Sequence, residues 1–134
     1  MDILTLDYLS FDLVLRTINS ISLMIIDKKI ADKVDIKIVE NVDFLARTGF
    51  DENGTAKIME INKKITKVKL KKLFFKVILH ELAHIIAEKK YGYSGHGEKY
   101  EHTCRLLGIP CNKKITLSKE EMEEMNDSKS LSDN

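Results

Sequence analysis

The chain carries His80, Glu81 and His84 within one short apolar stretch. In an α-helix, side chains at positions i and i+4 lie on the same face, so the two imidazoles could bind one metal ion. Glu81, beside the first histidine, could then reach a metal-bound water. This H-E-x-x-H arrangement is that of zinc-dependent hydrolases. It predicts one Zn²⁺ per chain, with Glu81 as the catalytic base.

A long helix is predicted around this motif. Residues 68–90 contain no proline or glycine, and Gly92 follows where a helix would end. Apolar residues in this stretch recur at three- and four-residue spacing, which is the period of an amphipathic helix. They are Leu70, Leu73, Phe74, Val77, Ile78, Leu82, Ile85 and Ile86. The motif therefore lies in the middle of a helix predicted over 68–90.

A catalytic zinc ion normally has three protein ligands and one water. Besides the motif, the chain has two more histidines, His96 and His102. The glycines around His96 permit a tight reversal of the chain after the long helix. Such a reversal could return His96 to the metal, so we predict His96 as the third ligand. Glu98, Glu101 and His102 remain alternatives.

Three neutral imidazoles on zinc lower the pKa of a bound water to about 7. Glu81 could accept the proton of this water during attack on a peptide carbonyl and pass it to the leaving amine. The predicted substrate is thus a protein or peptide. Candidate donors to the oxyanion are Tyr91, Tyr93 and Lys99, which lie nearby in sequence. The alternative is a non-proteolytic zinc protein, which would normally have four protein ligands.

The sequence HELAH at 80–84, followed after a short spacer by GHGEKY at 95–100, resembles the SprT-like metallopeptidases. This family includes the Spartan DNA–protein crosslink proteases and is related to the WLM group. Its pattern is H-E-x-x-H, a loop, and H-G-x-x-F. The resemblance implies zinc ligands at His80, His84 and His96 and a catalytic glutamate at Glu81. Tyr100 then replaces the aromatic residue of the family.

The resemblance extends over residues 46–110. Residues 46–50 and 57–62 resemble the strand pair that precedes the active-site helix of the family, and that second strand borders the substrate cleft there. A substrate backbone is therefore expected along the edge of a strand at 55–61. The chain has two cysteines, Cys104 and Cys111, and no C-x-x-C pair. The resemblance thus covers the peptidase core and not a cysteine-rich zinc ribbon.

The remaining pattern predicts an α+β fold of a small zincin-like type. It consists of an N-terminal helix, a small and mainly antiparallel sheet, the active-site helix and a short helix after it. Asp51 to Gly54 form a turn signal, and Ser118 with Glu121 forms a capping box. Besides the active-site helix, the expected helices are 6–27, 97–107 and 118–125, and the expected strands are 34–39 and 55–61.

With 134 residues, the chain has the length of one domain, which we place at 1–125, with a disordered acidic tail at 126–134. Near its start there is no basic region followed by an apolar stretch, as a signal peptide would have. The longest apolar run there, residues 23–26, is too short to span a bilayer. Two cysteines without an export signal are typical of the reducing cytosol. We therefore expect a soluble cytoplasmic protein without a membrane partner.

The net charge of +1 is unevenly distributed. Residues 1–117 hold 20 basic and 15 acidic side chains, whereas residues 118–134 hold 2 and 6. Seven lysines and no acidic residue lie in the segment from Lys63 to Lys76. This lysine-rich segment is either a solvated surface covered by the acidic tail or a nucleic-acid contact. The second interpretation predicts a DNA-associated protease that acts on DNA-bound proteins.

Overall fold

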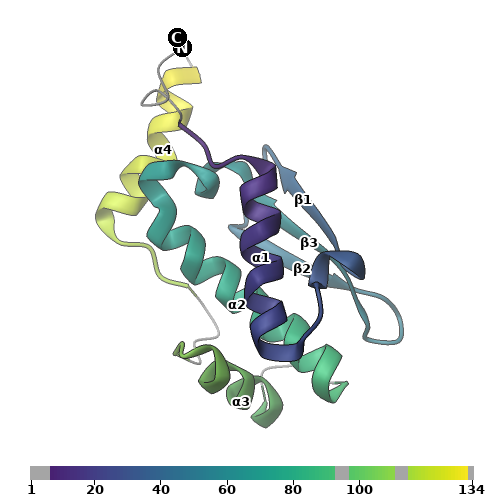
Figure 1. The fold of residues 1–134 in the computed structure, drawn as a ribbon. Coiled ribbons are helices and arrows are strands. Elements are labelled where there is room, and N and C mark those ends of the chain that lie inside the picture. The colour runs from purple at the N-terminus through teal and green to yellow at the C-terminus, as the bar shows by residue number, and fades with distance from the viewer. Residues whose placement is uncertain (1–6, 93–96, 111–114, 133–134) are drawn as a thin grey trace.

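The computed structural model describes residues 7–92, 97–110 and 115–132. These residues form an α+β fold of four α-helices and a three-stranded sheet (Figure 1). The main core lies where α1 (Phe11–Ile26) and α2 (Lys71–Tyr91) pack with the sheet. The α+β class predicted from the sequence is therefore confirmed. No helix among the described residues is both long and apolar enough to cross a membrane.

The sheet has the order β1-β3-β2, with β1 at Asp35–Val39, β2 at Ala46–Phe50 and β3 at Ala56–Asn62. The β2–β3 hairpin is antiparallel, whereas β1 and β3 are parallel. One of the two pairings is thus parallel, although we expected a mainly antiparallel sheet. The tight turn at Asp51–Thr55 forces the hairpin geometry. After β1, the chain first forms β2 at the far edge of the sheet, running opposite to β1. The hairpin then reverses the chain again, so β3 enters the central position parallel to β1.

The strand that we expected to offer an edge to the substrate is the central strand. β3 is hydrogen-bonded to β1 on one side and to β2 on the other, so its expected role as an open edge is wrong. Ala56, Met59 and Ile61 of β3 are fully buried, as fits a central strand. Within the described part of the chain, β2 pairs with β3 alone, which leaves the other side of β2 as an edge of the sheet.

The N-terminal helix begins later than predicted. The hydroxyl of Ser10 accepts a hydrogen bond from the backbone N–H of Leu13 (3.1 Å) and caps α1, which then starts at Phe11 rather than at residue 6. Val14 and Ile18 are fully buried against the core. The helix ends before Asp27, which has left-handed backbone geometry. These contacts hold α1 against α2 (Figure 1).

Helix α2 is the central helix of the fold. A 3₁₀ turn at Val68–Leu70 precedes it, and Gly92 ends it with a φ of 69°, which glycine adopts without strain. Every residue from Leu82 to Ala87 is buried. The sheet and α1 pack against α2, and α3 (Glu98–Leu107) packs against its second half. This burial from several sides keeps the middle of α2 away from bulk water.

The last helix, α4 (Lys119–Ser132), begins at the predicted capping box. The N–H of Ser118 donates to Glu121 Oε1 (2.8 Å), and the N–H of Glu121 donates to Ser118 Oγ (3.1 Å). Helix α4 extends past residue 125 into the segment that we expected to be a disordered tail. It lies near the start of α2, at the opposite end from α3 (Figure 1).

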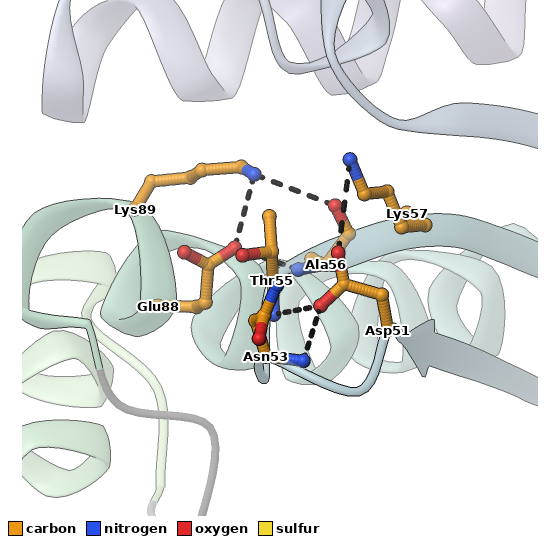
Figure 2. A network of polar contacts seen from close by, with 7 residues as sticks. All are labelled: Asp51, Asn53, Thr55, Ala56, Lys57, Glu88 and Lys89. Carbon is orange, nitrogen blue, oxygen red and sulfur yellow. Dashed lines mark hydrogen bonds and ion pairs between the residues drawn. The ribbon is translucent and has the colours of Figure 1, made fainter.

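The turn between β2 and β3 is organised by Asp51. Its Oδ1 accepts hydrogen bonds from the N–H groups of Asn53 (2.9 Å) and Thr55 (3.0 Å), as Figure 2 shows. These bonds stabilise the ionised form, and the one from Thr55 contributes most to lowering the pKa of Asp51. The turn therefore has a defined shape and sets the register in which β3 leaves it.

Beside this turn, α2 is joined to the start of β3. Glu88 Oε1 accepts a hydrogen bond from the N–H of Ala56 (2.7 Å) and pairs with Lys89 Nζ (3.0 Å). Lys89 Nζ also donates to the carbonyl of Ala56 (3.4 Å). Both polar groups of the buried Ala56 backbone thus have partners from α2. These contacts position the β2–β3 hairpin along α2.

Replacing Glu88 by alanine should destabilise the chain by about 1–3 kcal/mol, because the buried N–H of Ala56 loses its acceptor. Glu88→Gln is the matched variant, since its amide oxygen can still accept that bond. We expect a clearly smaller loss for glutamine. Urea unfolding of the three proteins measures the difference. Equal stability of the alanine and glutamine variants would show that this hydrogen bond does not join the hairpin to α2.

Candidate metal centre and active site

The two motif histidines lie on one face of α2. Their ring centroids are 5.1 Å apart, with the ring planes inclined at 76°. His84 is buried, and the side chain of His80 is 13% exposed. The Nε2 atom of His80 lies 4.0 Å from Glu81 Oε2. The structure therefore brings His80, Glu81 and His84 together on α2, as the motif predicts, and it leaves a small part of the His80 side chain exposed.

A residue that the motif did not reveal holds the Glu81 carboxylate. The hydroxyl of Thr48, in β2, donates a hydrogen bond to Glu81 Oε1 (2.7 Å). Thr48 and Glu81 are 33 positions apart in the sequence. A threonine in a short strand has no special pattern, so only the packing of β2 on α2 could identify it. Thr48 orients the carboxylate and is therefore a positioning residue.

Burial raises the pKa of the Glu81 carboxyl to about 7, against the opposing effect of the Thr48 hydrogen bond. The residue is 8% exposed, so water solvates its charged form poorly. A carboxyl group with a pKa near neutrality can exchange a proton under ordinary conditions. Carboxylates shifted in this way are common in catalytic sites.

In the metal-free protein, this raised pKa should make stability depend on pH. The folded chain binds the Glu81 proton more tightly than the unfolded chain, whose carboxyl has the ordinary pKa of 4.5. Stability is therefore fully present below the ordinary pKa and is lost as pH rises through about 7. Between about pH 5 and pH 8, we expect wild type to lose a few kcal/mol relative to Glu81→Gln.

Urea unfolding of both proteins in the presence of a chelator, at several pH values across this range, measures the effect. If the stability curves of the two proteins ran parallel, the burial of Glu81 would impose no cost on its charged form.

Tyr100 links helix α3 to the histidines of α2. Its hydroxyl lies 3.1 Å from His80 Nδ1, and its ring centroid lies 4.5 Å from that of His84. Tyr100 is buried and packs with Ala83 and Cys104. If Nδ1 of His80 carries the proton and donates it to the hydroxyl oxygen, Nε2 keeps the lone pair that a metal needs.

The predicted third ligand, His96, lies outside the described residues. Among the residues that the structure does describe, no three histidine, cysteine, aspartate or glutamate side chains form a group that could hold a metal ion. The structure therefore does not group the alternatives Glu98, Glu101 and His102 with the motif histidines, and their role as ligands stays a prediction. Their side chains are exposed on α3, and the ring of His102 packs against Tyr91 (5.8 Å between centroids).

Two of the three oxyanion candidates are described, and they contact each other. Lys99 Nζ lies 5.0 Å from the centroid of the Tyr91 ring, which also contacts His102. Tyr93 lies outside the described residues. Among the described aromatic hydroxyls, the one that contacts the histidine pair is that of Tyr100. Tyr91 and Lys99, which were predicted from their closeness in sequence, therefore pack on each other.

The lysine-rich segment (63–76) lies beside the acidic helix α4. Lys67 is 7% exposed, and its Nζ donates to the carbonyl oxygen of Glu124 (2.7 Å) and pairs with Glu124 Oε1 (3.3 Å). The charged residues around the adjoining hollow are Lys69, Lys71, Lys72, Glu120, Glu121 and Glu124. The carboxylates of α4 thus offset part of the positive charge. Nucleic-acid binding by this segment stays a prediction.

Comparison with known proteins finds one similar solved structure. No protein-family model matches the chain, and no curated protein matches it. The chain is similar to the metallopeptidase zymogen of Methanocaldococcus jannaschii jannalysin. The two are 21% identical, the match covers 90% of this chain and 97% of that chain, and the TM-score is 0.46.

Proposed function

We propose that the chain is a zinc-dependent peptidase of the SprT-like type that its motif resembles. Its substrates would be proteins or peptides. The observation that carries the proposal is the buried Glu81 carboxyl beside the His80 and His84 imidazoles on one face of α2. Burial of ionisable groups of this kind costs free energy that a bound metal ion would offset, which supports a metal site here.

The donor set fits one zinc ion. His80 and His84 would supply two imidazole nitrogens, and His96 is the proposed third ligand. Tyr100, at His80 Nδ1, would orient that ring and favour the tautomer with Nε2 available. When bound, zinc would lower the pKa of a water molecule and polarise the substrate carbonyl. Three protein ligands leave a position for this chemistry, whereas a structural site would normally have four.

Glu81 would serve as the general base and then as the general acid. Its carboxylate accepts a proton from the attacking water and later delivers that proton to the leaving amine. Thr48 holds Oε1 of this carboxylate during both transfers. A nearby cation would lower the Glu81 pKa from its metal-free value, because it favours the carboxylate. The base would then be ionised at neutral pH.

The edge of β2 is the best candidate for binding the substrate backbone. This strand carries Thr48, so a peptide paired along its outer edge would pass close to Glu81. Addition of an extended peptide to a sheet edge is a general mode of peptide recognition. The proposal thus moves the expected substrate edge from β3 to β2.

The direct test is incubation of the zinc-loaded chain with an unfolded protein and identification of the products by mass spectrometry. We expect new peptide termini that a chelator prevents and that added zinc restores. The Glu81→Gln variant serves as the control for contaminating proteases. Equal product formation by wild type and this variant would contradict the proposal.

Replacing Thr48 by valine should lower the rate of hydrolysis about tenfold, because a hydrogen bond to a charged group is lost. The variant should keep its zinc. It should also need a higher pH for half-maximal activity, since the Thr48 bond lowers the pKa of Glu81. Thr17→Val in α1, which removes a hydroxyl bonded to Leu13 O, is the matched control. An unshifted pH profile in Thr48→Val would refute the positioning role.

A further inference from the structure

A cleft of about 480 Å³ opens beside His80. One wall is the outer face of α2, with Phe75 and Leu79, and the other includes Ile109 after α3 and Ile115 before α4. This volume and this mainly apolar lining are typical of a ligand site. Phe75 is 45% exposed and lines the cleft, so its ring is accessible to a ligand there.

The cleft runs along the axis of α2, because Lys72, Lys76 and His80 all line it from the same face of that helix. These positions are four residues apart, so they follow one another by about one helical turn. At about 1.5 Å of rise per residue, Lys76 lies about 6 Å and Lys72 about 12 Å along the axis from His80. An extended peptide covers these distances in about two and four residues.

The lysine at the nearer distance is available for a ligand. Lys76 is exposed, and it forms no ion pair with a side chain in the described part of the chain. Lys72 also borders the hollow that Glu120 and Glu121 line, so part of its charge is offset. Lys72 and Lys76 both place positive charge on the rim of the cleft, and Lys76 is the nearer of the two to His80. An apolar cleft with lysines on its rim favours a ligand that carries an apolar side chain and, a short distance along its chain, an acidic one.

We propose that this cleft selects the substrate of the proposed peptidase. It would take an aliphatic or aromatic side chain next to the cleaved bond, and Lys76 would pair with an acidic residue about two positions further along. This inference rests on the proposed function of the same site. The substrate class is thus a peptide with an apolar residue followed or preceded at that distance by aspartate or glutamate.

Two variants test the two parts of this inference separately. Phe75→Ser removes apolar surface from the cleft, and Lys76→Glu reverses the charge on its rim. Phe11→Ser is the matched control for the first, since Phe11 is 47% exposed on α1. Lys37→Glu, at an exposed position of β1, is the control for the second. Zinc content and urea unfolding verify that every variant is folded and loaded.

The first measurement is cleavage of short peptides of randomised sequence, with the cut sites read by mass spectrometry. Wild type should prefer Leu, Ile, Met or Phe over Ala or Ser beside the cut by about tenfold or more. Phe75→Ser should lower this preference at least about threefold. Lys76→Glu should convert a preference for acidic residues into one for basic residues, a change of about tenfold. Neither control should change the preferences.

The second measurement does not need turnover. Fluorescein-labelled peptides that differ only by Leu against Ser, or Glu against Lys, are titrated into the zinc-loaded Glu81→Gln protein, and their anisotropy is followed. The Leu- and Glu-containing peptides should bind at least about fivefold more tightly. Loss of this difference in the Phe75→Ser and Lys76→Glu backgrounds would support the assignment of the cleft.

The outcomes separate this inference from the proposed function. Cleavage without apolar or acidic preference would overturn the inference and leave the peptidase. Selective binding without any cleavage would support the cleft and overturn the peptidase. If neither selective binding nor cleavage occurs, both are wrong. A dimer of wild type that Phe75→Ser converts to a monomer in sedimentation would also overturn the inference, because a second copy would then occupy the cleft.

Discussion

Replacing Glu81 by glutamine is expected to abolish peptide hydrolysis while zinc content stays at that of wild type. The amide has nearly the same shape as the carboxylate and can still accept the hydrogen bond of Thr48. It cannot take a proton from water at neutral pH, so the general-base step is lost. Such a step contributes about 10²- to 10⁴-fold to the rate. Steady-state cleavage of one defined peptide, with elemental analysis of the same samples, measures both quantities.

The same helix offers a matched control for this variant. Glu88→Gln makes the identical change two turns further along α2, where the side chain contacts Ala56 and Lys89. It should keep wild-type hydrolysis. A Glu81→Gln protein that still hydrolysed peptides would exclude Glu81 as the base. Loss of zinc from that variant would assign the residue a role in holding the metal instead.

Replacing His96 by alanine is expected to reduce zinc binding sharply. Wild type, purified without added metal, should carry about one zinc per chain. Loss of an outer hydrogen-bond partner of a ligand already costs about 10–100-fold in metal affinity, so loss of a ligand itself should cost more than about 100-fold. Elemental analysis after dialysis, followed by titration with zinc against a competing chelator, measures the change. Peptide hydrolysis should fall together with zinc content.

His102→Ala is the matched control, because His102 is an exposed histidine on α3 whose ring packs against Tyr91. We expect it to keep its zinc. If the His96→Ala protein kept its zinc in full, another side chain would have to be the third ligand. If wild type neither carried zinc nor bound it when it was supplied, the proposed function would lose its chemistry.

The two variants answer different questions about the same site. Glu81→Gln separates proton transfer from metal binding, whereas His96→Ala removes metal and proton transfer together. Their comparison also tests the non-proteolytic alternative. In a structural zinc site, loss of a ligand should lower stability, but Glu81→Gln should leave zinc content unchanged, and neither the wild type nor the variant should cleave peptides.

Several elements could be predicted because their signals are local. The period of apolar residues predicted the active-site helix. The helix ends at Tyr91, before Gly92 and one residue beyond the predicted end. The capping box at Ser118 and Glu121 forms as expected. The observed start of a helix differs from the predicted one where a capping residue determines it. Ser10 caps α1, so this helix begins later than the apolar pattern indicated.

The order of the strands could not be predicted in this way. Alternation of apolar residues indicates a strand and its buried face, but it does not say which neighbours the strand will have. The segment 55–61 was correctly predicted to be a strand, but its predicted position at an edge of the sheet was wrong. β3 is the central strand, and β2 forms an edge of the sheet. The cleft beside His80 was equally hidden, because its walls come from α2 and from residues around 109 and 115.

By itself, the sequence determined the spacing of His80, Glu81 and His84 and the helix that carries them. That information is local, since a helix places residues four positions apart on one face whatever surrounds it. Tertiary structure alone decided that Thr48 holds Glu81 and that Tyr100 contacts His80, across 33 and 20 positions of sequence. Contacts at such separations depend on how β2 and α3 pack against α2. The same packing buries Glu81 and so raises the pKa of its carboxyl.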